Sequence, residues 1–588
     1  MKSIFFSFVL ALVSCWCQAA DLTAEDVGPW LDGLMSYAIH TGDIAGGVVA
    51  VVRNGTVLIE RGYGFGDVAR RLPLDPRQTL IRPGSISKLF TWTAVMQQVE
   101  QGRLDLDVDV NRYLDFQVPP MTLRQIMTHT SGLEESLKDL DSTKPPVPLG
   151  EYLRSHLPRQ IYPPGETPAY SNYATALAGY IVAKVSGQSF EDYADEHILR
   201  PLGMLHSSFR QPLPADLAAA LSHGYKLGSG PPQSYEYFAP FPAGSLACTA
   251  DDMTRFMIAH LHSGARLLQP DTAKAMHTVQ KKIYPDLNGM ALGFYETSRN
   301  GHYILAHNGG TLYFHSDLHL FMEDDVGIFI SLNSAGTGET VSRIHDELFH
   351  GFADRYFPAS ASSTVSPTIA NQHARLIAGA WESSRRSATT FMSLAGLLSP
   401  MMISADADGT VTVPVPAHGN LRWREIKPFV WEQVDGVERM QAIVVDGRPV
   451  KIGFGMAPPA AFVPIPAHRS PTWLLPAAGI ALLVLLLSGI FWPVTTRLRV
   501  ANLASVAVML SFLVTLVYMS DDASLLSAAS DAWIYTLELI TLVTLPTAMV
   551  LAALAVRRRA GSLLLLASNA VLLWVAVTHH LLNFNTHF

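Results

Sequence analysis

The chain has 588 residues, of which 49% are hydrophobic and only 16% are charged, and its formal net charge is −8. A charged fraction well under the roughly 25% of an average soluble domain argues against a single soluble globule. The acidic balance argues against a nucleic-acid binder, because such a protein needs a basic face. At roughly 100–200 residues per domain, the length predicts three or four structural units.

Two of the three cysteines, Cys15 and Cys17, fall in the apolar N-terminal segment. The third, Cys248, is predicted to be a small buried side chain rather than a reactive thiol. These cysteines predict neither a disulfide framework nor a cysteine metal site, and the histidines lack the spacing of metal ligands. We therefore expect no metal and no cofactor.

The N-terminal segment has the composition of a secretory signal peptide. A positively charged start precedes an apolar run over 4–13, and small residues follow it. An apolar run of this length is too short to cross a bilayer, so we expect residues 1–20 to be removed on export. Lipidation of Cys15 is an alternative, because residues 12–15 resemble a lipobox.

The C-terminal region is predicted to cross the membrane. It contains four apolar stretches of roughly 20 residues, the length that a spanning helix needs. They lie at about 473–493, 500–519, 532–556 and 562–582.

The charges between these stretches predict the orientation. Arginines occupy the first and third connections, and aspartates occupy the second. By the positive-inside rule the arginine connections are cytoplasmic, which places residues 21–470 on the periplasmic or extracellular side of the cell membrane. The residues concerned are Arg497, Arg499, Arg557, Arg558, Arg559, Asp521, Asp522 and Asp531.

The exported part is expected to begin with an α+β domain over 21–357. Asn54-Gly55 between two apolar runs predicts a β-hairpin with a type I′ turn. Helical patterns lie between this hairpin and a late group of strands, so the sheet is expected to be closed by both ends of the domain. The expected strands are 44–52, 57–59, 303–305, 312–320 and 326–330, and the helical patterns include 89–99 and 174–185.

A second exported unit is predicted after a linker. Residues 358–367 have the composition of a linker, rich in Ser and Ala. Short strand-like runs over 368–468 predict a small β domain, and prolines then form a stiff spacer to the membrane region at 473–582.

The first candidate for chemistry is the segment 85–88, Ser-Ile-Ser-Lys, which follows a Pro-Gly helix breaker. Apolar residues recur after it at helical spacing, so Ser85 is predicted to open a mostly buried helix with Lys88 one turn on. A serine hydroxyl becomes nucleophilic when a base takes its proton, and burial near a helix N-terminus favours neutral lysine. The alternative is an N-cap serine and a surface lysine, because Ser-x-x-Lys also occurs by chance.

Two further motifs carry suitable groups. Tyr170 and Asn172 open a predicted helix, where a phenol could relay protons and an amide could hold a substrate carbonyl. His307 precedes Gly309 and Gly310 between two predicted strands, where glycine allows close approach of a substrate backbone. Taken singly, a capping segment and a hairpin turn are the alternatives.

Together the three motifs occur in the order Ser-x-x-Lys, Tyr-x-Asn and His-x-Gly, and this set resembles the serine β-lactamase and penicillin-binding-protein superfamily. It is most similar to the class C β-lactamase-related branch, which also holds DD-peptidases, D-aminopeptidases and esterases. The resemblance covers about residues 25–355 and includes the flanking stretches 123–132, 201–204 and 243–247. It implies an α+β fold with helices flanking an antiparallel sheet, before the small β domain and a four-helix transmembrane region.

The resemblance also implies roles for the motif residues. Ser85 would be the acylated nucleophile, and Lys88 and Tyr170 would share the work of general base and acid. Asn172 would bind a substrate amide. The backbone N–H groups of Ser85 and Gly310 would form the oxyanion hole.

The third motif departs from the pattern of the β-lactamases. His307 stands where they usually carry lysine, although His-x-Gly, with Gly309, is similar to the peptidases of the branch. His307 would orient the substrate or assist Tyr170. A fixed cation for a β-lactam carboxylate is expected to be missing, and so efficient β-lactam hydrolysis is not expected.

The predicted function is a membrane-anchored, extracytoplasmic hydrolase acting through an acyl-enzyme, with peptidase or amidase activity on D-amino-acid-containing or peptidoglycan-like substrates. An esterase is an alternative, because it would use the same atoms. A non-hydrolytic sensor of penicillin or cell-wall fragments is another, although the short predicted cytoplasmic loops argue against it. A transporter is disfavoured, because the spans carry few polar residues. The expected partners are a small-molecule or peptide substrate and membrane lipid, without nucleic acid, and a homo-oligomer through the membrane region is left open.

Overall fold

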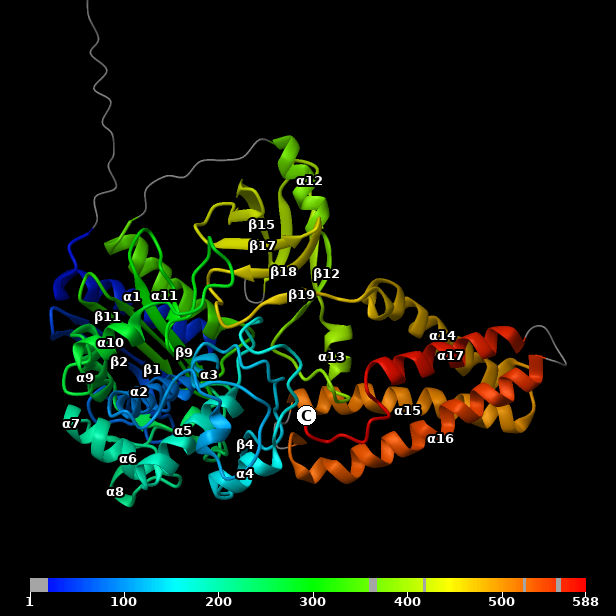
Figure 1. Ribbon diagram of the computed structural model, residues 1–588, viewed down its shortest axis with the longest axis horizontal. Coiled ribbons are helices and arrows are strands. Elements are labelled where there is room, and N and C mark those ends of the chain that lie inside the picture. The colour runs from blue at the N-terminus through cyan, green and yellow to red at the C-terminus, as the bar shows by residue number, and fades with distance from the viewer. Residues whose placement is uncertain (1–19, 359–366, 416–418, 522–524, 557–561) are drawn as a thin grey trace, which may run out of the picture.

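A computed structural model describes residues 20–358, 367–415, 419–521, 525–556 and 562–588. The predicted signal peptide, most of the predicted linker and the three arginines at 557–559 lie outside the described residues. The described chain forms a mixed α/β part, a small barrel and a bundle of helices, which follow one another in the sequence (Figure 1).

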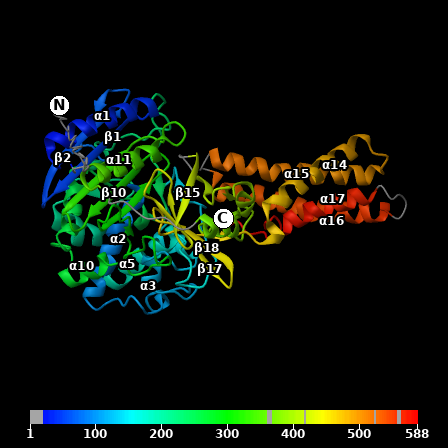
Figure 2. The ribbon, with the colours of Figure 1, turned by 90° about the horizontal axis from the view of Figure 1, so that it is seen from above.

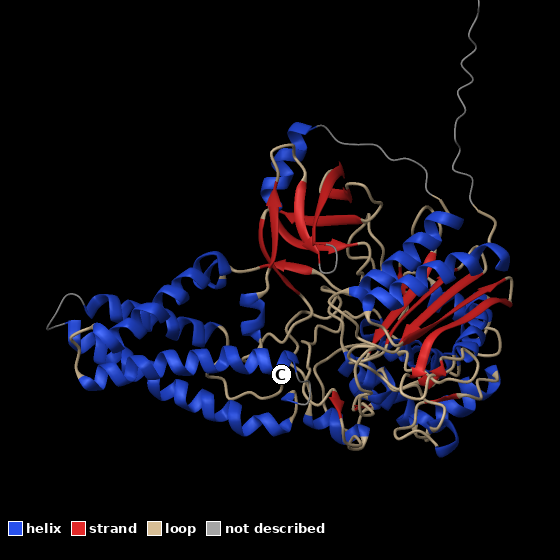
Figure 3. Cartoon of the chain, turned by 180° about the vertical axis from the view of Figure 1, so that it is seen from behind, coloured by secondary structure: helices blue, strands red, loops and turns tan. Residues whose placement is uncertain are grey.

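The first domain is built on a seven-stranded sheet whose neighbours come from both ends of the domain. β1 pairs with β2 on one side and with β11 on the other, and Val49 lies opposite Ile330. The predicted closure of the sheet is thus confirmed, and Figure 3 shows the sheet between helices. In spatial order the strands are β3 (Leu72–Pro73), β2 (Thr56–Asp67), β1 (Gly46–Arg53), β11 (Val326–Leu332), β10 (His315–Phe321), β9 (Ile304–Gly310) and β8 (Tyr295–Glu296).

The first hairpin has the predicted turn. Asn54 and Gly55 both have positive φ, at 50° and 71°, as a type I′ turn requires. The late strand predicted over 312–320 begins only at His315. A buried carboxylate, that of Glu236, accepts the backbone N–H of Leu312 at 2.7 Å and so takes this residue out of the ladder.

Both faces of the sheet are covered. Along β1, Val48, Ala50 and Val52 face one apolar core, while Val49 and Val51 face a second one. This alternation is expected for a strand that is buried on both sides. The first core contains α2 (Ser87–Glu100), α5 (Asn172–Ser186) and α9 (Ala250–Leu261), and the second is closed by α1 (Ala24–Gly42) and α11 (Thr340–Tyr356).

The small β domain is a closed barrel of eight strands. Trp423 and Trp431 are fully buried in its core, and closure pairs the first strand with the last. Helix α12 (Pro367–Ile377) precedes the barrel and packs on it. The strands are β12 (Gly379–Ser383), β13 (Met401–Ala405), β14 (Val411–Val415), β15 (Gly419–Lys427), β16 (Val430–Gln433), β17 (Arg439–Val445), β18 (Arg448–Phe454) and β19 (Phe462–Pro464).

The C-terminal helices form an elongated bundle that projects from the other two parts (Figure 2). Three segments are long and apolar enough to cross a membrane, with mean hydropathy between 2.2 and 2.5. Large apolar side chains such as Phe491 and Ile480 are exposed on the bundle, which is compatible with membrane anchoring. The helices are α14 (Pro471–Phe491), α15 (Thr496–Asp521), α16 (Asp531–Val556) and α17 (Ser562–Thr578).

Two sequence-based expectations about the bundle need correction. Within the described residues, helix α17 covers the 17 residues Ser562–Thr578, because the chain leaves the helix after Thr578 and runs to Phe588, which contacts the first domain. At 1.5 Å per residue, 17 residues reach about 26 Å, which is less than the roughly 30 Å of a hydrocarbon core. Arg497 and Arg499 were expected in a connection, but they lie within the first turns of α15.

Candidate active site

Ser85 lies in a 3₁₀ turn, Gly84–Ile86, that leads directly into α2 at Ser87. The sequence placed Ser85 at the helix start, and the structure adds this turn between the Pro-Gly breaker and the helix. Gly84 has a φ of 55°, which an L side chain rarely adopts. Because Gly84 carries the chain into the turn, Ser85 is presented at the end of a helix that is almost entirely buried.

Lys88 is fully buried and makes three hydrogen bonds. Its Nζ lies 2.8 Å from Ser85 Oγ, 2.7 Å from Asn172 Oδ1 and 2.8 Å from the carbonyl oxygen of Ala243. Burial lowers the pKa of Lys88 well below its ordinary value, and the positive charge of Arg385 adds to this effect.

The direction of the Lys88 lone pair follows from its partners. The Asn172 and Ala243 oxygens can only accept hydrogen bonds, so they retain the two N–H groups of a neutral amine. The lone pair is then directed at Ser85 Oγ. Of the alternatives raised by the sequence, a surface lysine is excluded by this burial.

Tyr170 lies just before α5, whose N-cap is Ser171. Its ring lies 4.8 Å from Lys88 Nζ and 4.7 Å from the Arg385 guanidinium. Burial raises the pKa of Tyr170, whereas the charge of Arg385 and a hydrogen bond with Ser85 act in the opposite direction. The capping role considered for this segment belongs to Ser171, which leaves the Tyr170 hydroxyl directed at the serine.

The end of β9 packs tightly against the serine turn. A Cβ at Gly309 would lie 2.1 Å from the Pro83 carbonyl oxygen, and a Cβ at Gly84 would lie 2.6 Å from Gly310 N. Only glycine allows these backbones to approach so closely. The motif at 307–310 is therefore strand rather than hairpin turn, and it brings Gly310 beside Ser85.

His307 lies behind the cavity wall. Its ring is fully buried and stacks on Tyr295 at 4.4 Å, and its Nδ1 lies 2.6 Å from the Asn308 carbonyl oxygen. Burial lowers the pKa of His307 to about 3, so the ring is neutral at ordinary pH. Within the described part of the chain, His307 is not among the cavity-lining residues. Of its two predicted roles, this position suits support of Tyr170 better than direct contact with substrate.

These elements enclose a cavity of about 580 Å³. The predicted residues Ser85, Tyr170, Asn172, Gly309 and Gly310 all line it, and Lys88 lies beneath. Further lining residues that the sequence analysis missed are Asp141, Tyr295, Asn308, His315, His345, Arg385 and the barrel residues Met456, Ala457, Pro459 and Ala460.

Arg385 is the most consequential of these residues. It follows β12, so it reaches the cavity from the barrel rather than from the first domain. It forms an ion pair with Glu135 while its own side chain is 44% exposed. Arg385 therefore brings to the cavity a guanidinium that the sequence analysis did not foresee. No local pattern marks this arginine, because its position depends on how the two domains pack.

Asp141 is a second missed charge. It lines the cavity close to the buried ion pair of Arg82 with Glu236. Burial raises the pKa of Asp141 to about 7, and the negative charge of Glu236 adds to this effect. Among the residues described, no group of His, Cys, Asp or Glu is arranged to hold a metal ion.

Comparison with known proteins identifies the family. The model of the Beta-lactamase family matches residues 31–350, which is more than half of the chain. The chain therefore belongs to the Beta-lactamase family, within the β-lactamase- and penicillin-binding-protein-like serine hydrolases, as the motif set predicted.

Similar proteins extend this result. Protein flp of Staphylococcus aureus (strain MRSA252) is 27% identical over 335 residues, which are 54% of this chain and 66% of that protein. The match thus spans slightly under two thirds of the relative. The crystal structure of SurE has a TM-score of 0.53 at 19% identity and covers 75% of this chain and 100% of its own. A structure of SurE with D-Leu has a TM-score of 0.51 at 20% identity and covers 74% of this chain and 99% of its own. These two structures support the fold.

Proposed function

We propose that the protein is a membrane-anchored, extracytoplasmic serine hydrolase that forms an acyl-enzyme at Ser85 and acts as a peptidase or amidase. The observation that carries the proposal is the three-way hydrogen bonding of Lys88. It leaves a neutral amine only one direction for its lone pair, toward the Ser85 hydroxyl.

In the first step, neutral Lys88 takes the proton of Ser85 as Oγ attacks the substrate carbonyl carbon. The carbonyl oxygen becomes an oxyanion, which the backbone N–H groups of Ser85 and Gly310 stabilise. Collapse of this intermediate breaks the bond to the leaving group. Tyr170, which lies between Lys88 and the cavity, passes a proton to the departing nitrogen or oxygen and recovers one from Lys88.

In the second step, water attacks the acyl group on Ser85. Lys88 and Tyr170 take a proton from the water, and Ser85 Oγ recovers one as the acid product leaves. The Oδ1 of Asn172 accepts a hydrogen bond from Lys88. The amide N–H₂ of Asn172 therefore remains free to donate to a substrate carbonyl.

The charges of the cavity favour a substrate that bears a carboxylate. Arg385 offers a planar guanidinium, which suits bidentate binding of a carboxylate. This supports a peptide-like substrate, and the structure of SurE with D-Leu makes D-amino-acid derivatives the first to test. The acyl-enzyme chemistry itself is equally compatible with an ester, so an esterase is the second candidate.

The helical bundle supports a location at the cell membrane, with the cavity on the outer side. Its three long apolar segments suit anchoring, and the positive-inside rule applied to the arginines of the sequence favours this orientation. A lateral contact between two copies through the bundle stays a prediction.

The proposal is tested by intact-mass measurement of the detergent-solubilised chain and its Ser85→Ala variant after incubation with a fluorophosphonate and with a penicillin. We expect a fluorophosphonate adduct on the unchanged chain that Ser85→Ala removes. A penicillin adduct that decays, together with turnover of a D-amino-acid amide, would favour the peptidase over the esterase. A stable adduct without turnover of any amide or ester would favour the sensor. Failure of the fluorophosphonate to label Ser85 would contradict the proposal.

A further inference from the structure

The helical bundle contacts the first domain through a short segment, residues 134–139, which we term the tail loop and which directly precedes the cavity-lining residues Leu140 and Asp141. Two successive backbone N–H groups of this loop, those of Leu137 and Lys138, donate to the main-chain oxygen of Phe588 at 2.9 and 2.7 Å. The N–H of Asp139 donates to the carbonyl oxygen of Leu526 at 2.7 Å. The backbone N–H groups of residues 137–139 are thus paired with the C-terminal region, whereas that of Glu134 donates to the Arg159 carbonyl oxygen of its own domain at 2.9 Å.

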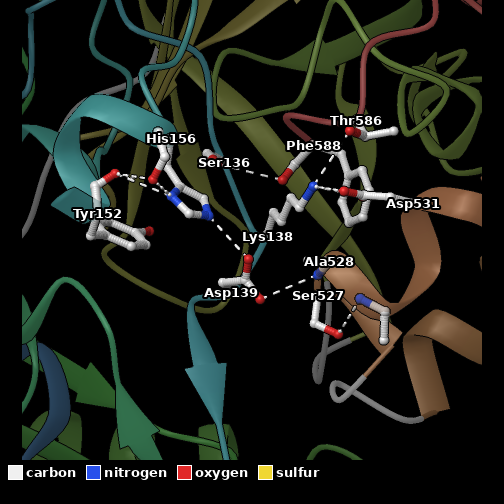
Figure 4. Close-up of polar contacts among 12 residues, drawn as sticks. Ser136, Lys138, Asp139, Tyr152, His156, Ser527, Ala528, Asp531, Thr586 and Phe588 are labelled. Carbon is white, nitrogen blue, oxygen red and sulfur yellow. Dashed lines mark hydrogen bonds and ion pairs between the residues drawn. The ribbon is translucent and has the colours of Figure 1, made fainter. Parts of the chain in front are cut away.

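An ion pair accompanies these backbone contacts. Lys138 Nζ lies 2.6 and 2.7 Å from the two carboxylate oxygens of Asp531, the first residue of α16. Figure 4 shows Lys138 directed between Asp531 and Phe588. Lys138 is only 7% exposed and Asp531 is 27% exposed, so solvent and salt screen this pair less than a surface pair.

On its other side the tail loop contacts the segment that carries Arg385. Glu135 forms the ion pair with Arg385, and its backbone N–H donates to the Arg386 carbonyl oxygen at 3.1 Å. Glu134 accepts the backbone N–H groups of Ala388 and Thr389 at 2.7 and 3.0 Å. Two adjacent carboxylates therefore fix the chain around the active-site arginine.

The tail loop has little regular structure of its own to define its shape. The flanking elements are α3, which ends at Met127, and β4, which begins at Asp141. Between them, contacts with the bundle and with residues 385–389 provide much of the restraint on the loop. Asp141 lines the cavity and lies two residues beyond the tail loop. Movement of the loop would therefore also displace the cavity wall.

We propose that the Lys138–Asp531 ion pair is a positioning contact for the active site. The bundle fixes the tail loop, and the loop, through Glu134 and Glu135, fixes Arg385 over the ring of Tyr170. Lys138 and Asp531 touch no reacting atom, so both are positioning residues. The inference rests on the proposed function, and it gives the bundle a role in substrate binding besides anchoring.

The first test is hydrogen exchange of the full chain in detergent, which measures the protection of backbone amides and does not depend on catalytic turnover. We compare the unchanged protein with Lys138→Met, Lys138→Arg and Asp531→Asn. The matched control is Arg355→Met, which breaks a similarly close ion pair between Arg355 and Asp26 that joins α11 to α1. Loss of the Lys138–Asp531 ion pair should speed hydrogen exchange in the peptide containing residues 385–389 by about tenfold, since local opening controls exchange. Lys138→Arg and the control should leave this peptide unchanged.

The second test is steady-state kinetics with two substrates that differ only in a free carboxylate or its neutral amide. Lys138→Met and Asp531→Asn should raise KM for the carboxylate substrate by roughly tenfold, the size of one charged hydrogen bond. The KM for the neutral substrate and the rate of fluorophosphonate labelling should change by less than about twofold, because Ser85 and Lys88 keep their contacts. Lys138→Arg should restore the KM.

The outcomes separate the two proposals. Unchanged exchange at 385–389 in both Lys138→Met and Asp531→Asn would overturn the positioning role, whether or not the protein is a hydrolase. Equal losses with both substrates and with the probe, accompanied by a lowered unfolding midpoint, would also overturn it, because together they indicate general destabilisation. Failure of the unchanged chain to react at Ser85, with exchange responding as expected, would overturn only the proposed function.

Discussion

The guanidinium of Arg385 lies 4.7 Å from the ring centroid of Tyr170, although the two residues belong to different domains. The barrel therefore completes the cavity instead of only flanking it. Since Tyr170 hydrogen-bonds with Ser85, a residue of the second domain acts electrostatically on the proton relay of the first.

Removal of the arginine charge should weaken binding of carboxylate substrates. We expect Arg385→Met to lower kcat/KM by about 10- to 100-fold for a substrate with a free carboxylate, since a hydrogen bond to a charged group contributes about 1.5–3 kcal/mol. The value of kcat/KM for the neutral amide of the same substrate should fall much less. Equal losses for the two substrates would show that Arg385 positions Tyr170 rather than the carboxylate.

Lys88 should be indispensable for acylation. Lys88→Met removes the base and keeps an unbranched apolar stem, so we expect the rate of fluorophosphonate labelling at Ser85 to fall by roughly 10³-fold or more. The thermal unfolding midpoint should be measured alongside, because the change removes a buried ionisable group but also leaves the oxygens of Asn172 and Ala243 without this donor. A variant that labels at the normal rate would exclude Lys88 as the base.

Replacing the amide of Asn172 by a carboxylate should change the charge state of Lys88. Asn172→Asp places a carboxylate 2.7 Å from Nζ, which favours the ammonium form and raises the pKa of Lys88. Activity that needs neutral Lys88 rises as pH passes the lysine pKa, so the acidic limb of the kcat profile should move to higher pH in this variant. The unchanged enzyme should reach its plateau at a pH well below the ordinary lysine pKa, because burial lowers the pKa of Lys88.

Close packing of β9 on the serine turn predicts an effect of a single methyl group. Gly309→Ala would place Cβ 2.1 Å from the Pro83 carbonyl oxygen, so Gly310 must move away from Ser85 and the oxyanion site must open. Loss of one oxyanion donor costs about 10²- to 10³-fold in kcat. Gly396→Ala is the control, because its Cβ would have no atom within 4 Å in the described structure. Equal activity of the two variants would contradict the assigned oxyanion site.

Local patterns in the sequence were sufficient for the framework. The Asn54-Gly55 turn, the apolar run of β1 and the Pro-Gly breaker before Ser85 each act over a few residues, and the structure contains all three. Spacing along α2 also places Lys88 beside Ser85, because residues three apart share a helix face.

The missed residues depend on long-range packing. Arg385 and Asp141 reach the cavity through contacts between segments far apart in the sequence, such as Glu135 with Arg385 and Asp141 with Phe238, which leave no periodic signal. The length of α17 was overestimated for a related reason. Its apolar composition continues beyond Thr578, but the chain there turns to contact both exported domains. His579 Nδ1 lies 3.2 Å from the carbonyl oxygen of Ser393 in the barrel domain, and the main-chain oxygen of Phe588 accepts hydrogen bonds from the first domain.

Asp141 provides a prediction for stability. Its folded pKa of about 7 exceeds the ordinary aspartate value of 3.8, so folding favours the protonated form. As pH rises from about 4 to 7, the unfolded state loses this proton first, and the folded state is progressively destabilised; above about 7 the penalty is constant. Asn mimics the protonated acid and carries no such penalty. The unfolding midpoint of Asp141→Asn minus that of the unchanged protein should therefore increase between pH 4 and 7 and then level off. A difference independent of pH would mean that Asp141 ionises normally in the folded state and that the cavity wall at this point is open to water.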